Sequence, residues 1–279
     1  MNGFQRFFLK SLLAFSLFAL SGCDKDIPYS DKPLRTIYAD GVQHLKNKSY
    51  ERAADEFDQV EQQHPYSFWA PKAQLLSAYA SFKNGNYARA IGTLDNFIQL
   101  HPYHELASYA YYLRALSYFD QIQSVSRDMQ NTEQAFQALG EVAMRFPDTP
   151  YGKVALYKRN YAFQQLAAHH MHVGRYYQSR NQFLAALSRF QLVYRHYRNT
   201  DYAPEAVLRI IECSLSLGLV DEAQEALKVL KNTCSKTPWY QHGSTLLKKH
   251  EVKRSSLPSR HFLKREARSS SKPQPQKGR

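Results

Sequence analysis

The chain has few cysteines and none of the compact motifs that carry enzyme chemistry. Its 279 residues include only three cysteines, Cys23, Cys213 and Cys234. It contains no Gly-rich phosphate loop, no nucleophile elbow and no Cys-x-x-Cys pair. No set of an acid, a base and a nucleophile stands out either. We therefore expect a binding protein and not an enzyme.

Potential metal ligands are also sparse. The best candidate is the string His169-His170-x-His172, in which His169 and His172 share one face of a helix. Imidazoles so placed could bind a metal ion, but no third ligand with convincing spacing stands nearby. A polar helix surface is the better interpretation, and we predict no metal and no other dissociable cofactor.

No apolar run at the N-terminus is long enough to cross a bilayer as a permanent helix. The run from Ser11 to Leu20 follows two basic residues, Arg6 and Lys10. Spanning a bilayer takes about 20 apolar residues. A basic start, a short apolar stretch and the small residues Ser21-Gly22 before Cys23 instead predict a secretory signal.

Ending that signal on cysteine resembles the bacterial lipobox, which implies a lipid anchor. The resemblance implies cleavage before Cys23, S-diacylglycerol on its thiol and an N-acyl chain on its new amine. Several acyl chains exceed what stable membrane anchoring needs. We thus predict a lipoprotein signal peptide over 1–22 and a lipidated tether over 23–33. An ordinary signal peptide with a coincidental cysteine is the alternative.

The other two cysteines are predicted to remain separate thiols. An oxidising compartment would permit a disulfide. In a helical hairpin turning near Gly218, Cys213 faces about residue 225, so Cys234 lies roughly 13 Å further along the second helix. That distance exceeds the roughly 7 Å Cα separation a disulfide tolerates.

Net positive charge is concentrated near the C-terminus. Although the net charge is +13, the residues from Lys248 onward carry +9 of it. The tail is also rich in Ser, Pro and Gln, and such composition cannot bury a core. We therefore predict a basic disordered tail over 241–279. It is either simply solvated or in weak contact with anionic lipid or another polyanion.

A repeat with an offset of 37 residues organises the rest of the chain. Tyr50-Glu51-Arg52-Ala53 returns as Tyr87-Ala88-Arg89-Ala90, and the His-Pro-Tyr strings at 64–66 and 101–103 keep the same offset. Each repeated Ala is followed by apolar residues four and seven positions later and by proline at twelve. Apolar positions 0, 4 and 7 share one face of a helix. The proline at position twelve then ends that helix.

Five units fit this pattern, and it resembles the tetratricopeptide repeat. Successive Ala positions differ by 37, 45, 51 and 37, with extra residues near Gln121–Asn131 and Ala167–Gly174. We predict an all-α fold, an α-solenoid of five tetratricopeptide-like helix–turn–helix repeats over 34–240. Such arrays present extended binding surfaces and stack units without a closed core. The repeat anchors are Ala53, Ala90, Ala135, Ala186 and Ala223.

A lipobox followed by five such repeats resembles the BamD (ComL) family of lipoproteins from the outer-membrane β-barrel assembly machine. Three local strings strengthen the resemblance: Pro65-Tyr66-Ser67, the stretch from Arg145 to Tyr151, and His172 to Tyr177 with its Arg-Tyr-Tyr. The likeness covers roughly residues 20 to 235. Arg198-Asn199 stands where the family often has Pro-Asp.

The resemblance implies partners for the two halves of the array. The N-terminal units would receive unfolded β-barrel outer-membrane precursors, with Tyr38, Tyr79 and Tyr112 as candidate contacts. The C-terminal units would bind the POTRA domains of BamA, with Arg175, Arg189 and Tyr194 as candidates. Other assembly-machine lipoproteins are further implied partners, whereas nucleic acid is not.

The resemblance also implies a location, the periplasmic face of the bacterial outer membrane. Asp24 directly follows the lipidated cysteine, and in enteric bacteria Asp at that position favours the inner membrane, so inner-membrane retention stays an alternative. Other functions also stay open: a pilus-assembly or cell-envelope tether, a cell-wall hydrolase with a repeat domain, or nucleic-acid binding through the tail.

Overall fold

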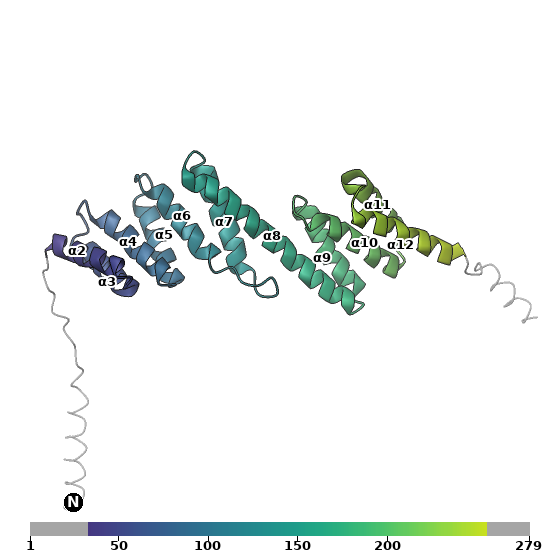
Figure 1. Ribbon diagram of the computed structural model, residues 1–279, viewed down its shortest axis with the longest axis horizontal. Coiled ribbons are helices and arrows are strands. Elements are labelled where there is room, and N and C mark those ends of the chain that lie inside the picture. Colours follow the sequence, from purple (N-terminus) through teal and green to yellow (C-terminus); the bar gives the residue numbers. More distant parts are fainter. Residues whose placement is uncertain (1–32, 256–279) are drawn as a thin grey trace, which may run out of the picture.

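The computed structural model describes residues 33–255, and all regular structure within them is helical. Cys23, the predicted signal peptide and most of the tether lie outside this range. Figure 1 shows the helices following one another along the long axis of the molecule. They are α2 (Leu34–Lys46), α3 (Tyr50–Gln63), α4 (Ala70–Lys83), α5 (Tyr87–Leu100), α6 (Ala107–Phe119), α7 (Gln130–Arg145), α8 (Pro150–Ser179), α9 (Phe183–His196), α10 (Ala203–Leu217), α11 (Val220–Cys234) and α12 (Pro238–Ser255).

The helices α2 to α11 form five consecutive pairs, and each helix packs on the next one along the chain. Each pair corresponds to one of the five units expected from the repeat. The all-α solenoid of tetratricopeptide-like repeats is therefore confirmed. Because every unit contacts mainly its neighbours, the apolar core divides into four clusters along the array instead of one centre.

The second helix of each unit buries the same positions. The repeated Ala and the apolar residues four and seven places later are essentially inaccessible to solvent in the first four units. The fifth unit buries Ala223 and Leu230, while Leu227 is only partly covered. The 0, 4, 7 spacing thus marks the helix face that packs into the core. In the first four units the buried residues are Ala53, Phe57, Val60, Ala90, Leu94, Phe97, Ala135, Leu139, Val142, Ala186, Phe190 and Val193.

A glycine on the first helix receives a phenylalanine ring in two of the units. A Cβ atom added to Gly41 would lie 2.8 Å from the ring of Phe57, and one added to Gly174 would lie 2.5 Å from the ring of Phe190. Both distances are shorter than real Cβ contacts allow. Glycine at these positions therefore lets the paired helices approach closely enough to enclose the ring.

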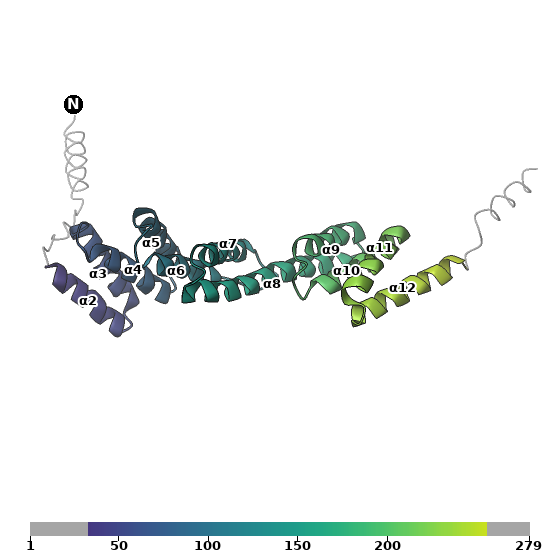
Figure 2. The same cartoon turned by 90° about the horizontal axis from the view of Figure 1, so that it is seen from above.

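The two irregular spacings have different structural causes. The extra residues near Gln121 form the connection between α6 and α7, where His169 Nδ1 donates a hydrogen bond of 2.7 Å to the carbonyl oxygen of Val125. Those near Ala167–Gly174 lengthen α8 to 30 residues. Figure 2 shows α8 running from α7 across to α9, so this one helix joins the two halves of the array.

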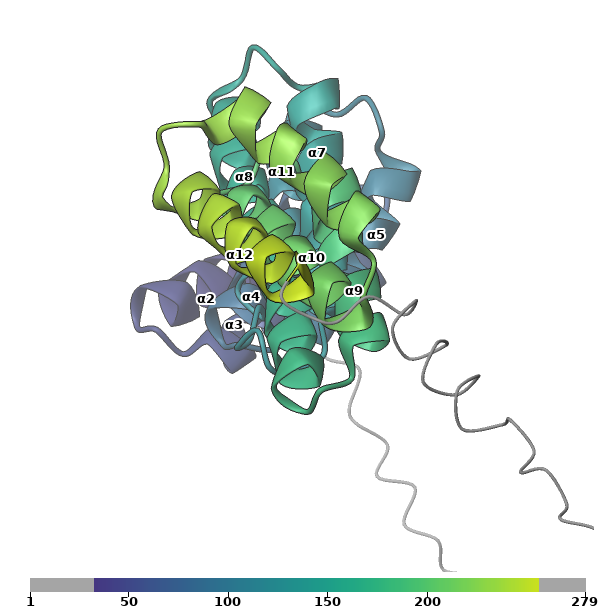
Figure 3. The ribbon, with the colours of Figure 1, turned by 90° about the vertical axis from the view of Figure 1, so that its right-hand side faces the viewer.

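The predicted start of the basic tail at residue 241 was wrong, because α12 continues to Ser255. Trp239, Tyr240 and Leu246 pack against the C-terminal core cluster, and Leu247 is buried in it. Figure 3 shows α12 lying over the end of the array beside α10 and α11, with which it is in contact. The helix covers the last unit, as a terminal capping element of a solenoid does.

Cys213 and Cys234 are separate free thiols, as the helix geometry predicted. Cys213 is buried on α10, and burial, together with the nearby Glu212, raises its pKa to about 11. Such a thiol stays protonated and packs as a small apolar side chain. Within residues 33–255, none of the helices has the length and apolar character needed to cross a membrane.

Candidate partner-binding surfaces

Tyr38, the first candidate for precursor contact, packs inside the first unit. Its ring meets Phe57 at 5.5 Å and Trp69 at 4.6 Å between centroids, both edge to face. Burial raises the pKa of its hydroxyl. The residue is half-buried, so part of its surface stays accessible, while most of its ring supports the junction of α2, α3 and the segment before α4.

Tyr79 and Tyr112 belong to one tyrosine cluster on α4, α6 and α8. Tyr112 stacks on Tyr151 with centroids 5.3 Å apart, and Tyr109 packs on the same ring at 5.5 Å. Burial, with the neighbouring hydroxyls of Tyr79, Tyr151 and Tyr112, raises the pKa of Tyr109 to about 12. The structure thus brings two of the three candidates near each other and leaves Tyr38 with Trp69. Their contact with a precursor stays a prediction.

The most exposed aromatic side chains of the N-terminal half are ones that the sequence reasoning did not select. Tyr66 and Tyr103 are fully exposed, and Phe68 is 77 % exposed. Tyr66 and Tyr103 occupy the same repeat position, each directly after the proline that follows the second helix. The 37-residue offset already marked both of them. A single exposed ring is ordinary on a protein surface, so it is the equivalent position in successive units that makes these two tyrosines candidates for partner contact.

Arg175, the first candidate for the BamA-facing side, is held by an internal ion pair. Its guanidinium donates two hydrogen bonds to Glu205 on α10, of 3.0 Å from Nε and 2.7 Å from Nη2. Burial alone would raise the pKa of Glu205, but the hydrogen bonds from Arg175 and the positive charges of Arg175 and Arg209 lower it overall. Arg209 also binds Glu212. This network fixes α8 against α10.

Arg189 and Tyr194 lie on different faces of α9. They are five positions apart, which places them about 140° from each other around a helix. Arg189 is near His170 of α8, whose pKa falls to about 4 through burial and then the charges of His169, Arg189 and His196. The three C-terminal candidates therefore do not form one patch. Their roles in partner binding stay predictions.

Tyr194 lines an open groove between α9 and α11, with α10 as its floor. We call this the α9–α11 groove. Its larger cavity has a volume of about 640 Å³, and an adjoining cavity of about 380 Å³ shares Tyr194, Val207 and Val229 with it. Arg198 packs its guanidinium over the Tyr194 ring at 4.8 Å. Tyr194 therefore lies where the two cavities meet.

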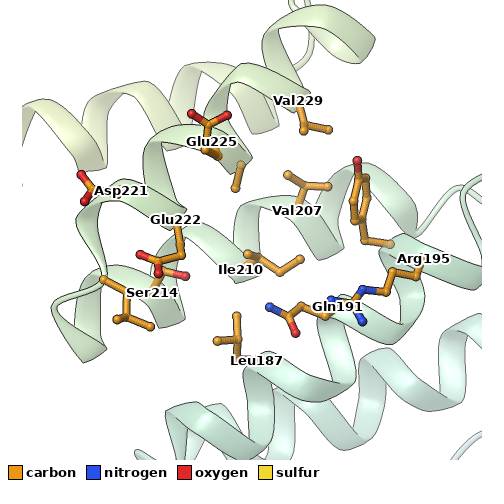
Figure 4. A pocket seen from close by; sticks show the side chains of 13 residues that line it. Leu187, Gln191, Arg195, Val207, Ile210, Ser214, Asp221, Glu222, Glu225 and Val229 are labelled. Atoms are coloured by element: carbon orange, nitrogen blue, oxygen red, sulfur yellow. The ribbon is translucent and has the colours of Figure 1, made fainter.

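The walls of the larger cavity differ in charge. Figure 4 shows the carboxylates of Asp221, Glu222 and Glu225 on α11 and the side chains of Gln191 and Arg195 across from them on α9. The apolar side chains of the lining include Leu187, Val207, Ile210 and Val229. An apolar floor beside a predominantly acidic wall suits an extended segment that carries both apolar and basic side chains.

Among the residues that line the larger cavity, only Tyr194 was predicted as a partner contact, through the family resemblance. Leu187, Gln191, Tyr194 and Arg195 stand at positions i, i+4, i+7 and i+8, which share a helix face. Because this face of α9 carries both polar and apolar side chains, hydrophobic periodicity does not mark it. The described residues contain no group of three His, Cys, Asp or Glu that could hold a metal ion.

Comparison with known proteins places the chain in a family. Residues 30–230 match the family model YfiO, described as outer membrane lipoprotein. The matched range spans all five helical pairs except the last turn of α11. It includes both the exposed tyrosines of the N-terminal half and nearly all of the α9–α11 groove.

Individual relatives match most of their own length. A protein of Caulobacter vibrioides named outer membrane protein assembly factor BamD is 37 % identical over 258 residues, covering 92 % of this chain and 85 % of the relative. Its namesake in Rickettsia prowazekii is 34 % identical, covering 87 % and 97 %. That of Neisseria meningitidis serogroup A is 32 % identical, covering 84 % and 94 %.

Proposed function

The chain belongs to the outer membrane lipoprotein family YfiO, and from that premise we propose that it is a scaffold subunit of the β-barrel assembly machine. The observation that carries the proposal is the 37 % identity to an outer membrane protein assembly factor over 92 % of the chain. The role is one of binding and not of catalysis. Its partners are BamA, other assembly-machine lipoproteins and unfolded outer-membrane precursors.

In this proposal the N-terminal units receive the precursor. An unfolded barrel strand is extended and alternates apolar or aromatic side chains with polar ones. The exposed rings of Tyr66 and Tyr103, one per unit, would contact such side chains at successive points along the array. Tyr38, Tyr79 and Tyr112 would then act mainly by supporting the helices from which this surface is built.

The C-terminal units hold the POTRA domains of BamA in this proposal. The α9–α11 groove offers an apolar floor with charged sides, which is the composition of a specific protein interface. Tyr194 lies where its cavities meet and would be the aromatic anchor. Arg189 is half-buried and makes no ion pair within residues 33–255, so its charge is available to a partner.

The proposed anchor is Cys23, with S-diacylglycerol on its thiol and an acyl chain on its amine. The anchor would hold the array at the periplasmic face of the outer membrane. A Cys23→Ser variant should leave the membrane fraction and appear in the soluble periplasm. Density fractionation of membranes tests the alternative raised by Asp24, since recovery in the inner membrane would contradict the proposed location.

Co-purification tests the proposal as a whole. The full chain, expressed in its own host and extracted in mild detergent, should carry BamA with it, identified by mass. Recovery of pilus-assembly or cell-wall proteins without BamA would favour the envelope-tether function instead. Incubation with peptidoglycan supplies a check on catalysis, because measurable hydrolysis by the purified chain would contradict a purely binding role.

Substitutions in the two halves of the array should affect the binding of different partners. Tyr194→Ala should weaken BamA recovery and spare precursor binding, because it removes the ring at the meeting point of the two cavities. The pair Tyr66→Ser and Tyr103→Ser should do the opposite. Leu184→Ala is the matched control for both, since Leu184 is exposed on α9 but lines neither cavity. Unchanged BamA recovery in Arg189→Ala would remove Arg189 from the interface.

A further inference from the structure

The α9–α11 groove has three carboxylates, two of them in the first turn of α11, and none of them forms an ion pair with a cation that lines the groove. Asp221 and Glu222 form no ion pair within the described residues, and Glu225 pairs only with the exposed Lys228, three positions along its own helix. Arg195 is the single cation that lines the larger cavity and Arg198 lines the adjoining one, so three carboxylates face two guanidiniums along the groove. An occupant with several positive charges would complement this wall.

A buried hydroxyl in the same cavity points to an occupant independently of the charges. Ser214 lines the larger cavity from α10, and its side chain is fully buried. Its Oγ has no hydrogen-bond partner in the described part of the chain. An unsatisfied buried hydroxyl costs free energy, about 1–3 kcal/mol, which a polar backbone or side-chain group in the groove would recover.

We propose that the occupant is the chain's own C-terminal segment, residues 256–279, bound across the α9–α11 groove. This segment has seven Lys/Arg residues and one acid, Glu266. The apolar pair Phe262-Leu263 stands between Arg260 and Lys264-Arg265. The pair would lie on the apolar floor while the flanking cations face the carboxylates of α11, and a backbone amide would reach Ser214.

The segment starts close to the groove. Gln224 of α11 donates a hydrogen bond of 3.4 Å to Glu251 of α12, so the end of α12 lies beside the first turns of α11. The chain leaves α12 at Ser255, about one helical turn later. Extended, 24 residues span up to roughly 80 Å, ample to pass around α11 and cross the groove.

Occupation by the tail would act as a built-in competitor for this surface. A partner must displace a segment whose effective concentration is high because it is tethered nearby. The attraction is between exposed or half-exposed charges, so salt weakens it. Competition of this kind would shield the apolar floor until a partner with a better fit arrives. The inference concerns the free chain and holds whether or not the partner is BamA.

Photo-crosslinking in the full chain tests the proposal. A benzophenone-bearing phenylalanine at position 262 should form crosslinks to residues 187–229 of the same chain, mapped by mass spectrometry. Mixing isotopically heavy and light chains separates crosslinks within a chain from those between chains. Raising the salt to 0.5 M should reduce the yield, since charge pairing drives the contact.

Matched charge variants sharpen the test. The double variant Glu222→Gln, Glu225→Gln should lower the groove crosslinks roughly fivefold, because two exposed charge contacts are lost. Glu105→Gln with Asp128→Asn changes the net charge equally at exposed sites outside the groove and should leave the yield unchanged. Circular dichroism confirms that each variant keeps its helices.

Four results would overturn the proposal. Equal yields in the two double variants would show that the acidic wall does not hold the tail. Crosslinks between heavy and light chains would assign the groove to a second copy. Crosslinks to lipid in vesicles containing anionic lipid would assign the tail to the membrane surface. Crosslinks to other helices, or none, would leave the groove without this occupant.

Discussion

At the scale of single residues, Gly174 shows how a missing side chain can be essential. Replacing it with Ala would put a methyl group 2.5 Å from the ring of Phe190, which is fully buried and cannot retreat. We expect Gly174→Ala to lower the free energy of unfolding by about 1–3 kcal/mol, the usual cost of overpacking a core. Urea unfolding followed by circular dichroism measures it.

Gly92 provides the control for that substitution. It also lies within a helix, α5, but a Cβ atom there would meet nothing within 4 Å. Gly92→Ala should therefore stabilise the chain by about 0.5–1 kcal/mol through helix propensity. If Gly174→Ala also leaves the chain as stable as the parent or more stable, the ring of Phe190 is not held as tightly as the structure indicates.

Glu205 gives the array a pH-dependent contact. Its pKa in the folded chain lies below the ordinary carboxyl value, chiefly because Arg175 outweighs the opposing effect of burial. A lowered folded pKa means that the carboxylate contributes stability above its unfolded pKa, and that this stability is lost as pH falls through the folded value. Stability should therefore decline below about pH 4.5, the ordinary pKa of a glutamate carboxyl group.

Glu205→Gln isolates that contribution. The variant should be less stable than the parent at pH 7, because Arg175 loses its charged partner and Arg209 loses one of its two. The difference should shrink as the pH falls to 3. Urea midpoints at several pH values measure it, with Glu105→Gln as the exposed control. A difference that stays constant over this range would mean that Glu205 acts only through packing.

At the scale of elements, one hydrogen bond from a distant helix ties the connection between α6 and α7 to α8. His169 reaches it across 44 positions in sequence and binds the carbonyl of Val125. His169→Phe removes the donor while keeping a planar ring. Trypsin cleavage after the exposed Arg127 should accelerate several-fold, with global stability changed by roughly 1 kcal/mol.

His172→Phe is the comparison for that experiment. His172 lies on the same helix, is exposed and makes no hydrogen bond or ion pair within the described residues. The variant should be cleaved at the parent's rate. Equal acceleration in both variants would attribute the effect to α8 as a whole, and no acceleration in either would show that the connection is fixed by other contacts.

The helix α12 is a structural part of the array, and Leu247 tests this. Leu247 is buried in the C-terminal core cluster, so Leu247→Ala should cost about 2–4 kcal/mol. Leu184→Ala, at an exposed position of α9, should cost less than about 0.5 kcal/mol. Thermal unfolding compares them. A loss as small as that of the control would mean that α12 does not cap the last unit.

The helix α12 is also the part of the described fold that the sequence pattern did not predict. The five units were predictable because Ala, Phe and Val recur at a spacing that only one helix face can bury. The helix α12 was missed because its anchors, Trp239, Gly243 and Leu247, stand outside the repeat and shortly before the basic run that begins at Lys248. A Cβ atom added to Gly243 would lie 3.1 Å from the side chain of Ile211, and composition cannot reveal such a close approach.

The candidate site was less predictable than the fold. The 37-residue offset marked Tyr66 and Tyr103, yet exposure is a property of the folded surface and had to come from the structure. Tyr194 was predicted as a partner contact and does line the groove, whereas Arg175 forms an internal ion pair with Glu205. Local periodicity specifies which face is buried, but not which polar residues from separate helices meet.

At the scale of the whole molecule, stability should be distributed along the array. The N-terminal cluster around Phe57 draws on α2, α3 and α4, whereas the cluster around Phe190 draws on α8 to α12. The two clusters share no residue. In a solenoid, unit stabilities and nearest-neighbour contacts add along the chain. A substitution that loosens the packing of one cluster should therefore destabilise mainly the helices that build that cluster.

Phe57→Leu and Phe190→Leu make that expectation testable as a symmetrical pair. Each trims a fully buried ring, and each should cost about 1–3 kcal/mol. Native-state hydrogen exchange should show faster exchange in α2 to α4 for the first variant and in α8 to α11 for the second, because each cluster opens by itself. The opposite half serves as the internal control in each case. Acceleration of equal size in both halves would show that the 30-residue helix α8 couples them into one cooperative unit, so that a partner bound to the C-terminal half would also stabilise the surface of Tyr66 and Tyr103.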